Sequence, residues 1–142
     1  MADITQTAAN VGIRLGTVPT KLIQFGGTVT QGQPLYRAST GKYLAADAND
    51  GVEKSVVTGI ALTPGVLDSF GIMALPSTSP GASLVNLGAT LAVGETYAVS
   101  ATVGAIAPVA DLSSGQFITI LGVAVTASLL DFQTIISSTA KA

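Results

Sequence analysis

The sequence contains one pattern twice, and this internal duplication constrains the fold more than any other feature. Residues 27–62 and residues 88–125 each hold a short extended run, a glycine turn, a second run, another glycine turn and a final β-branched run. The first turns align through Gly32 and Gly94, which stand 62 residues apart, whereas the glycines of the final runs stand 63 residues apart. One inserted residue near Val103 therefore reconciles the two copies.

Each copy has the pattern of short strands joined by tight turns. The glycines supply positions that can adopt positive φ, which tight turns need. The β-branched runs between them favour extended backbone. Two copies of such a unit are typical of a sandwich or barrel, because a solenoid needs three or more repeats. We therefore predict an all-β fold, a compact β-sandwich or barrel built from two pseudo-repeated strand-turn-strand units.

The chain is long enough for one domain preceded by a short arm. Residues 1–10 are small and polar, and they predict an N-terminal arm that orders only against a partner, or else a frayed terminus. Residues 11–142 are predicted to form a single β domain. In it, Val11, Ile13 and Leu15 alternate with other residues, which predicts a half-buried first strand.

The run from Phe117 to Val125 is apolar at both parities of a strand. A solvated antiparallel strand alternates instead. We therefore expect this strand to be covered on both faces, either inside a closed barrel or at a subunit interface.

The chain carries few charges, and this limits the classes of partner that it could bind. Charged residues make up 10% of the sequence against 48% hydrophobic residues, with a net charge of −2. The cations are scattered singly, so we predict no nucleic-acid binding. The most apolar window, residues 117–130, is too short to cross a bilayer as a helix, and we predict no membrane association. With a mean hydropathy of +0.59, some apolar surface is expected to meet another protein.

The side chains needed for catalysis are scarce. The sequence has no cysteine and no histidine, and no Gly-x-Ser-x-Gly motif is present. Asp47, Asp50 and Glu53 are the one close group of acids, in a turn without an apolar run to raise a pKa. A calcium loop would need an acid where Val57 stands, so an Asx-type turn is the better reading. We predict that the chain is not an enzyme and binds no cofactor or metal.

Several motifs resemble small head proteins of tailed bacteriophages, of the capsid decoration or cement type, over residues 8–136. In chain order the motifs are Ala-x-Asn-Val at 8–11, Gly-x-Val-Thr-x-Gly-Gln-Pro-Leu-Tyr at 27–36, Gly-Lys-Tyr-Leu-Ala-Ala-Asp at 41–47, Val-x-Gly-Ile-Ala-Leu at 57–62, Gly-Ala-Thr-Leu-x-x-Gly-x-x-Tyr at 88–97, Ile-Ala-Pro-x-Ala-Asp-Leu at 106–112 and Ile-x-Ile-Leu-Gly-Val-Ala at 118–124. The resemblance implies a structural virion protein on the outer capsid surface. Its partners would be the major capsid protein and further copies of itself, as a dimer or trimer.

The contact with the coat or with a neighbouring subunit is predicted near the start of the chain, since an arm along a neighbour would add strand pairing. The candidate residues are Ile4, Val11, Ile13, Arg14 and Leu15. The alternative is that residues 11–15 are simply the first core strand. Removing residues 2–10 is expected to leave the domain folded and to weaken capsid binding.

Two other functions remain open from the sequence. One is a low-copy head or tail structural protein with the same fold. The other is a glycan-binding adhesion module, for which Tyr36, Tyr43 and Tyr97 are the candidate aromatic platforms. These tyrosines lie at strand positions, where packing is the commoner use.

Overall fold

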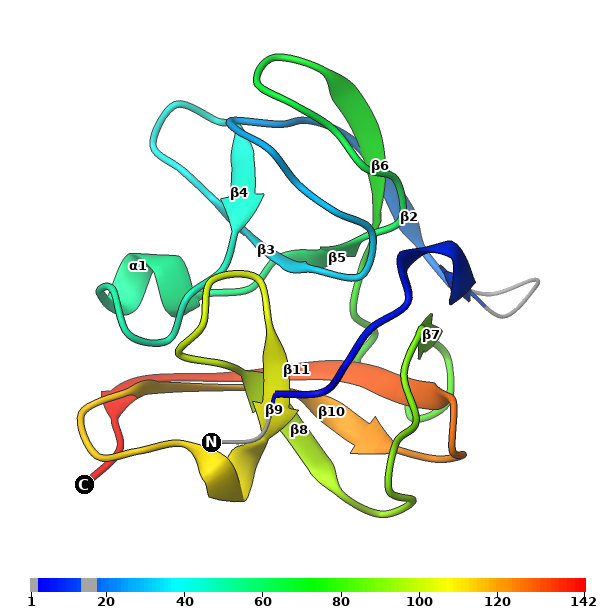
Figure 1. Ribbon diagram of the computed structural model, residues 1–142, viewed down its shortest axis with the longest axis vertical. Coiled ribbons are helices and arrows are strands. Elements are labelled where there is room, and N and C mark those ends of the chain that lie inside the picture. Colours follow the sequence, from blue (N-terminus) through cyan, green and yellow to red (C-terminus); the bar gives the residue numbers. More distant parts are fainter. Residues whose placement is uncertain (1–2, 14–17) are drawn as a thin grey trace.

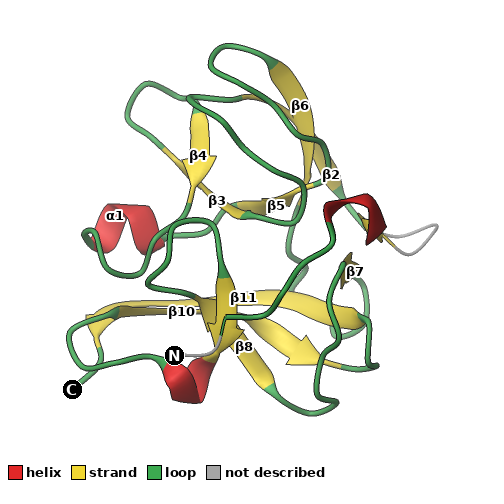
Figure 2. Cartoon of the chain, in the orientation of Figure 1, coloured by secondary structure: helices red, strands yellow, loops and turns green. Residues whose placement is uncertain are grey.

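Two antiparallel sheets build the molecule in the computed structural model, which describes residues 3–13 and 18–142 (Figures 1 and 2). The prediction of an all-β fold is confirmed. The five-stranded sheet has the order β2-β6-β5-β3-β4, with β2 (Thr20–Gln24), β3 (Pro34–Arg37), β4 (Tyr43–Ala45), β5 (Gly59–Ala61) and β6 (Phe70–Ala74). The six-stranded sheet has the order β1-β7-β11-β10-β8-β9, with β1 (Val11–Ile13), β7 (Leu84–Leu87), β8 (Thr96–Val99), β9 (Ile106–Pro108), β10 (Phe117–Ala124) and β11 (Leu129–Ala140).

Short helical segments connect some of these strands. They are η1 (Ala8–Asn10), α1 (Val52–Ser55) and η2 (Val109–Asp111). Within the described ranges, no helix has the length and apolar character needed to cross a membrane.

The two sheets share one strand order. We call residues 20–74 unit one and residues 84–140 unit two. In each unit the five strands, numbered along the chain, lie in the order first, fifth, fourth, second, third, and β1 is an addition outside this scheme. The duplication seen in the sequence is therefore a duplication of the whole five-stranded topology.

Equivalent residues of the two units make equivalent pairs. Leu35 faces Gly59 in unit one, and Tyr97 faces Gly122 in unit two. The turn glycines also match, with φ of 91° at Gly32 and 86° at Gly94. Their hydrogen bonds correspond as well: Gly32 N–H donates to Ala61 O and Gly94 N–H donates to Ala124 O, both at 2.8 Å. Only glycine adopts such φ values without strain, which explains why both turns carry it.

The main core lies between the two sheets and draws on both units. Its fully buried side chains include Ile60 from unit one and Leu87, Leu121 and Phe132 from unit two. Unit one also curls around a second, smaller core of its own. The side chains of this second core are Ile23, Phe25, Val29, Leu35, Tyr43, Ala61 and Met73.

The outer face of β10 differs from the sequence expectation. Leu121 and Ala124 are buried in the main core, whereas Val123 and Val125 are exposed. The cause is a register shift between Ile120 and Gly122 in the pairing with both neighbouring strands. A bulge of this kind changes which side chains face the core. The strand is therefore not covered on both faces in this chain alone.

Candidate functional site

The two units close in different ways, and this difference determines where the N-terminal segment lies. In unit one, Phe25 follows β2 directly and forms a parallel bridge with Tyr43 of β4. Gly26 N–H donates to Tyr43 O at 2.8 Å. The two edge strands of unit one thus meet, and the sheet closes on itself.

Unit two is closed by residues 3–10 instead. The residue equivalent to Tyr43 is Ile106, and its carbonyl accepts the Ile4 N–H at 2.8 Å. On the other side, Thr7 N–H donates at 2.6 Å to the carbonyl of Gly88, the equivalent of Gly26. The N-terminal segment therefore lies between two edges that meet directly in unit one.

Side chains of this segment fix it to both units. Ile4 is partly buried against the main core. The Gln6 Nε2 donates to the carbonyls of Gly32 in unit one and Leu87 in unit two, at 3.0 and 2.9 Å. Asp3 accepts a hydrogen bond from the Ser100 hydroxyl. Residues 3–10 are thus ordered against their own chain.

The five residues predicted for coat or subunit contact divide into two groups. Ile4 and Ile13 pack against the main core, and Val11 is buried. Val11 and Ile13 belong to β1, which pairs with β7 at the edge of the six-stranded sheet. This placement matches the alternative of a first core strand. Arg14 and Leu15 lie outside the described residues.

An exposed apolar face lies elsewhere, on unit one, and sequence reasoning missed it. Leu22 of β2 is 71% exposed and Phe70 of β6 is 69% exposed. Leu22 lies opposite Ile72 in the β2–β6 pairing, and Ile72 is exposed too. The neighbouring loop adds the exposed side chains of Val66 and Leu67. We call Leu22, Val66, Leu67, Phe70 and Ile72 the apolar face of unit one.

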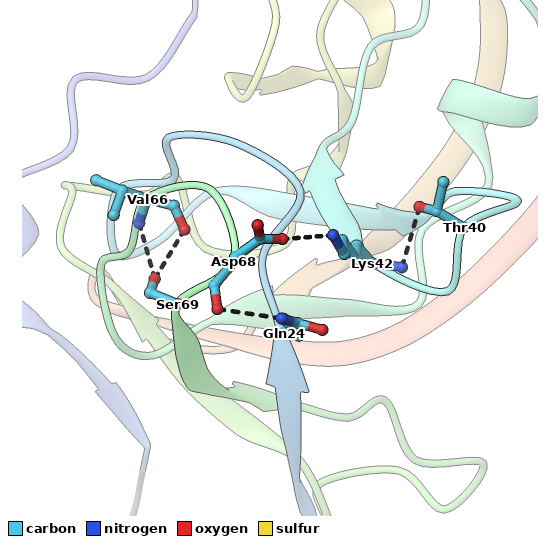
Figure 3. A network of polar contacts seen from close by, with 6 residues as sticks. All are labelled: Gln24, Thr40, Lys42, Val66, Asp68 and Ser69. Carbon is cyan, nitrogen blue, oxygen red and sulfur yellow. Dashed lines mark hydrogen bonds and ion pairs between the residues drawn. The ribbon is translucent and has the colours of Figure 1, made fainter.

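Polar contacts hold the loop of this face in place (Figure 3). Asp68 forms an ion pair with Lys42, and its backbone carbonyl accepts a hydrogen bond from Gln24 Nε2 at 3.1 Å. The Ser69 hydroxyl contacts both the N–H and the carbonyl of Val66, at 2.9 and 2.8 Å. Asp68 has a φ of 68°, a conformation that non-glycine residues adopt only where the surroundings hold it. The loop therefore presents its apolar side chains in a fixed arrangement.

A hollow adjoins this face. It has a volume of about 590 Å³ and is lined by residues that include Val29, Pro64, Val66 and Phe70. The hollow is open, so it suits an inserted side chain of a partner better than an enclosed small molecule.

The three tyrosines considered as glycan platforms are buried. Tyr36, Tyr43 and Tyr97 are each less than a tenth exposed. The Tyr97 hydroxyl accepts the N–H of Ala92 at 2.9 Å, and Lys21 donates to the Tyr43 hydroxyl at 3.3 Å. Their rings serve packing within the two units.

The acidic loop of unit one is engaged in local contacts. Asp47 Oδ1 accepts the Asn49 N–H at 2.8 Å, which is an Asx turn, and Asp50 pairs with Lys54. The hydrogen bond and charge of Asp50 raise the pKa of Lys54 above its ordinary value of 10.5. Within residues 3–13 and 18–142, no three acidic, cysteine or histidine side chains gather as metal ligands would.

Comparisons with known proteins add no family to this picture. No protein-family model matches the chain, and no curated protein matches it significantly.

Proposed function

We propose that this chain is a structural virion protein that binds the outer surface of a tailed-phage capsid and stabilises contacts between coat subunits. The observation that carries the proposal is the apolar face of unit one. Five large apolar side chains are exposed together on two paired strands and one fixed loop. Contiguous exposed apolar side chains of this kind mark protein-binding surfaces.

The low charge and the apolar face of the chain fit a protein partner whose contact surface is also largely apolar. A surface with few charges and a fixed apolar loop gains affinity from buried area rather than from charge attraction. A stable contact buries roughly 1,600 Å² in total. Repeated over a closed shell, such contacts stabilise the assembled state because the protein binds the assembled coat in preference to free subunits. The motif resemblance favours the major capsid protein as this partner.

Counting copies in purified particles tests this function. Quantitative peptide mass spectrometry would compare this chain with the coat subunit in particles from the source culture. A simple ratio between the two supports a shell-wide cement protein. A handful of copies per particle supports instead the low-copy head or tail protein, and absence from the particles contradicts both.

A binding assay tests the surface itself. Purified protein would be sedimented with particles that lack it, comparing Phe70→Asp with the matched change Val93→Asp. Val93 is 68% exposed on unit two, so both changes place an acid on an exposed apolar position. We expect Phe70→Asp to abolish co-sedimentation and Val93→Asp to leave it unchanged. Equal binding by both variants would remove the apolar face from the proposal.

A further inference from the structure

Three cations that stand apart in the sequence come together in the folded unit one. Arg37 ends β3 and lies opposite Tyr43 of β4. Lys42 precedes Tyr43 in the chain and forms the ion pair with Asp68 (Figure 3). Lys21 of β2 donates to the Tyr43 hydroxyl, and its ammonium lies 5.8 Å from the centre of the Tyr43 ring. We call Lys21, Arg37 and Lys42 the basic group.

The positive charge of the basic group is only partly neutralised. Asp68 pairs with Lys42, whereas Lys21 and Arg37 are exposed and take part in no ion pair among residues 3–13 and 18–142. The other acids of unit one lie within residues 47–53, beyond the opposite end of β4. Unit two contains three acids and no cation. A chain with a net charge of −2 thus concentrates its positive charge in one place.

The basic group borders the apolar face of unit one. Lys42 binds Asp68, which follows Leu67 in the loop of that face. Lys21 directly precedes Leu22 on β2. Protein interfaces combine an apolar centre with a polar rim. The apolar face therefore has a rim that is positive along the side formed by the basic group.

We propose that the coat surface bound by the apolar face carries carboxylates beside an apolar centre, and that the basic group orients the chain on this surface. The inference rests on the proposed function, because it names the chemistry of the partner at the same face. Opposite charges at a rim steer the encounter and fix its orientation more than they add affinity.

An acidic coat surface would also exclude the wrong orientation. Unit two and residues 47–53 are acidic, so such a surface repels them while it attracts the basic group. Unit two then points away from the shell. A phosphate backbone is a poorer partner, because it leaves the apolar side chains beside the basic group unused and needs a longer row of cations.

Association kinetics test the steering. Surface plasmon resonance would compare Arg37→Glu with Lys54→Glu on immobilised particles that lack the protein, at low and high salt. Both variants change the net charge equally, but Lys54 lies on α1, away from the basic group. We expect Arg37→Glu to slow association about tenfold at low salt and to weaken its dependence on salt. Lys54→Glu should stay near the wild-type rate, and equal slowing by both variants would overturn the proposal.

Blocking the carboxylates of the partner tests its chemistry. Particles treated with a carbodiimide and a neutral amine carry amides in place of surface carboxylates, and electron microscopy would establish that they stay intact. Wild-type protein should bind treated particles about tenfold more slowly, whereas Arg37→Glu should lose little further, since the attraction is already removed. Slowing by the same factor for both proteins would overturn the acidic partner.

The outcomes separate this inference from the proposed function. Binding that Phe70→Asp abolishes, with equal rates for Arg37→Glu and Lys54→Glu, would overturn the inference and leave the capsid function. Failure of the wild type to bind particles would overturn both. Retention of the wild type, but not of Arg37→Glu, on duplex DNA would assign the basic group to phosphates and overturn the inference. Lys21→Glu is a second variant of the basic group, and circular dichroism would establish that each variant is folded.

Discussion

The two units share one topology but close in different ways. Unit one joins its edge strands through Phe25 and Tyr43, and it surrounds a small core of its own. In unit two the equivalent edges are separated, and residues 3–10 occupy the space between them. Unit two contributes its buried side chains to the core that it shares with unit one.

This difference shows what a duplicated sequence can and cannot provide. The repeated turns and strands are sufficient to produce the same order of five strands twice. Closing the second unit requires a segment that has no counterpart in the repeat. The N-terminal segment is thus a structural part of unit two, whatever further contact it makes with a partner.

The largest expected effect comes from removing the closing side chain of unit one. Phe25 is fully buried at the centre of the small core, and Phe25→Ala should lower the free energy of unfolding by about 4 kcal/mol. Ile4, which lies at the corresponding closure of unit two, is only partly buried, so Ile4→Ala should cost about 1 kcal/mol. Urea denaturation measures both. Equal losses would mean that the two closing side chains contribute equally to the free energy of unfolding, which would contradict the difference between the two closures.

A second test compares the glycines of the two final runs. A Cβ at Gly122 would lie 1.9 Å from the backbone oxygen of Asp131, and φ there is 150°. Gly122→Ala should therefore cost about 3 kcal/mol through overpacking and backbone strain. At Gly59 the nearest backbone oxygen is that of Ala74, at 2.6 Å. Gly59→Ala should therefore cost less than Gly122→Ala. Thermal unfolding of both variants measures the two costs, and the opposite ranking would contradict the bulge in β10.

Deleting residues 2–10 tests the role of the N-terminal segment. The domain is expected to remain folded but less stable, because backbone hydrogen bonds to Ile106 and Gly88 would be lost. Two further hydrogen bonds, from Gln6 to the carbonyls of Gly32 and Leu87, would be lost as well. Each of the four bonds contributes about 1 kcal/mol, and the chain entropy regained offsets part of the loss, so we expect a net cost of about 2 kcal/mol.

Hydrogen exchange would show which strands lose stability when residues 2–10 are deleted. Protection should decrease in β9, whereas the equivalent β4 of unit one should keep its protection and serves as the internal control. Uniform loss across both strands would contradict the separate closure of the two units.

The sequence predicted much of the repeated architecture because its signals are local. Turn glycines and β-branched runs indicated β3, β5, β8 and β10. Residues 137–140 are small and mostly polar, with no alternation that predicts a strand, yet they extend β11, because the pairing with β10 depends on tertiary contacts. The short strand β7 was missed for the same reason: β1 and β11 flank it from distant parts of the chain.

The candidate surfaces were harder to predict. Residues 69–75 are apolar almost throughout, so no alternation of apolar and polar residues indicates that Phe70 and Ile72 point outward. The docking of residues 3–10 also left no pattern, since no equivalent segment exists in unit one. Both features follow from how the two sheets are placed, which periodicity does not encode.

The smallest expected effect concerns α1, which occurs in unit one where the equivalent residues of unit two enter β10. Asp50 raises the pKa of Lys54, so the ion pair stabilises the folded state below pH 10.5 and the benefit is lost as pH rises through the folded pKa. Exposed pairs contribute little. Lys54→Met should therefore lower the melting temperature slightly at pH 7 and low salt. Above the pKa of Lys54 in the folded state, the substitution should leave the melting temperature unchanged. A shift as large as that of Gly59→Ala would mean that α1 supports unit one, and the units would then differ in more than their closure.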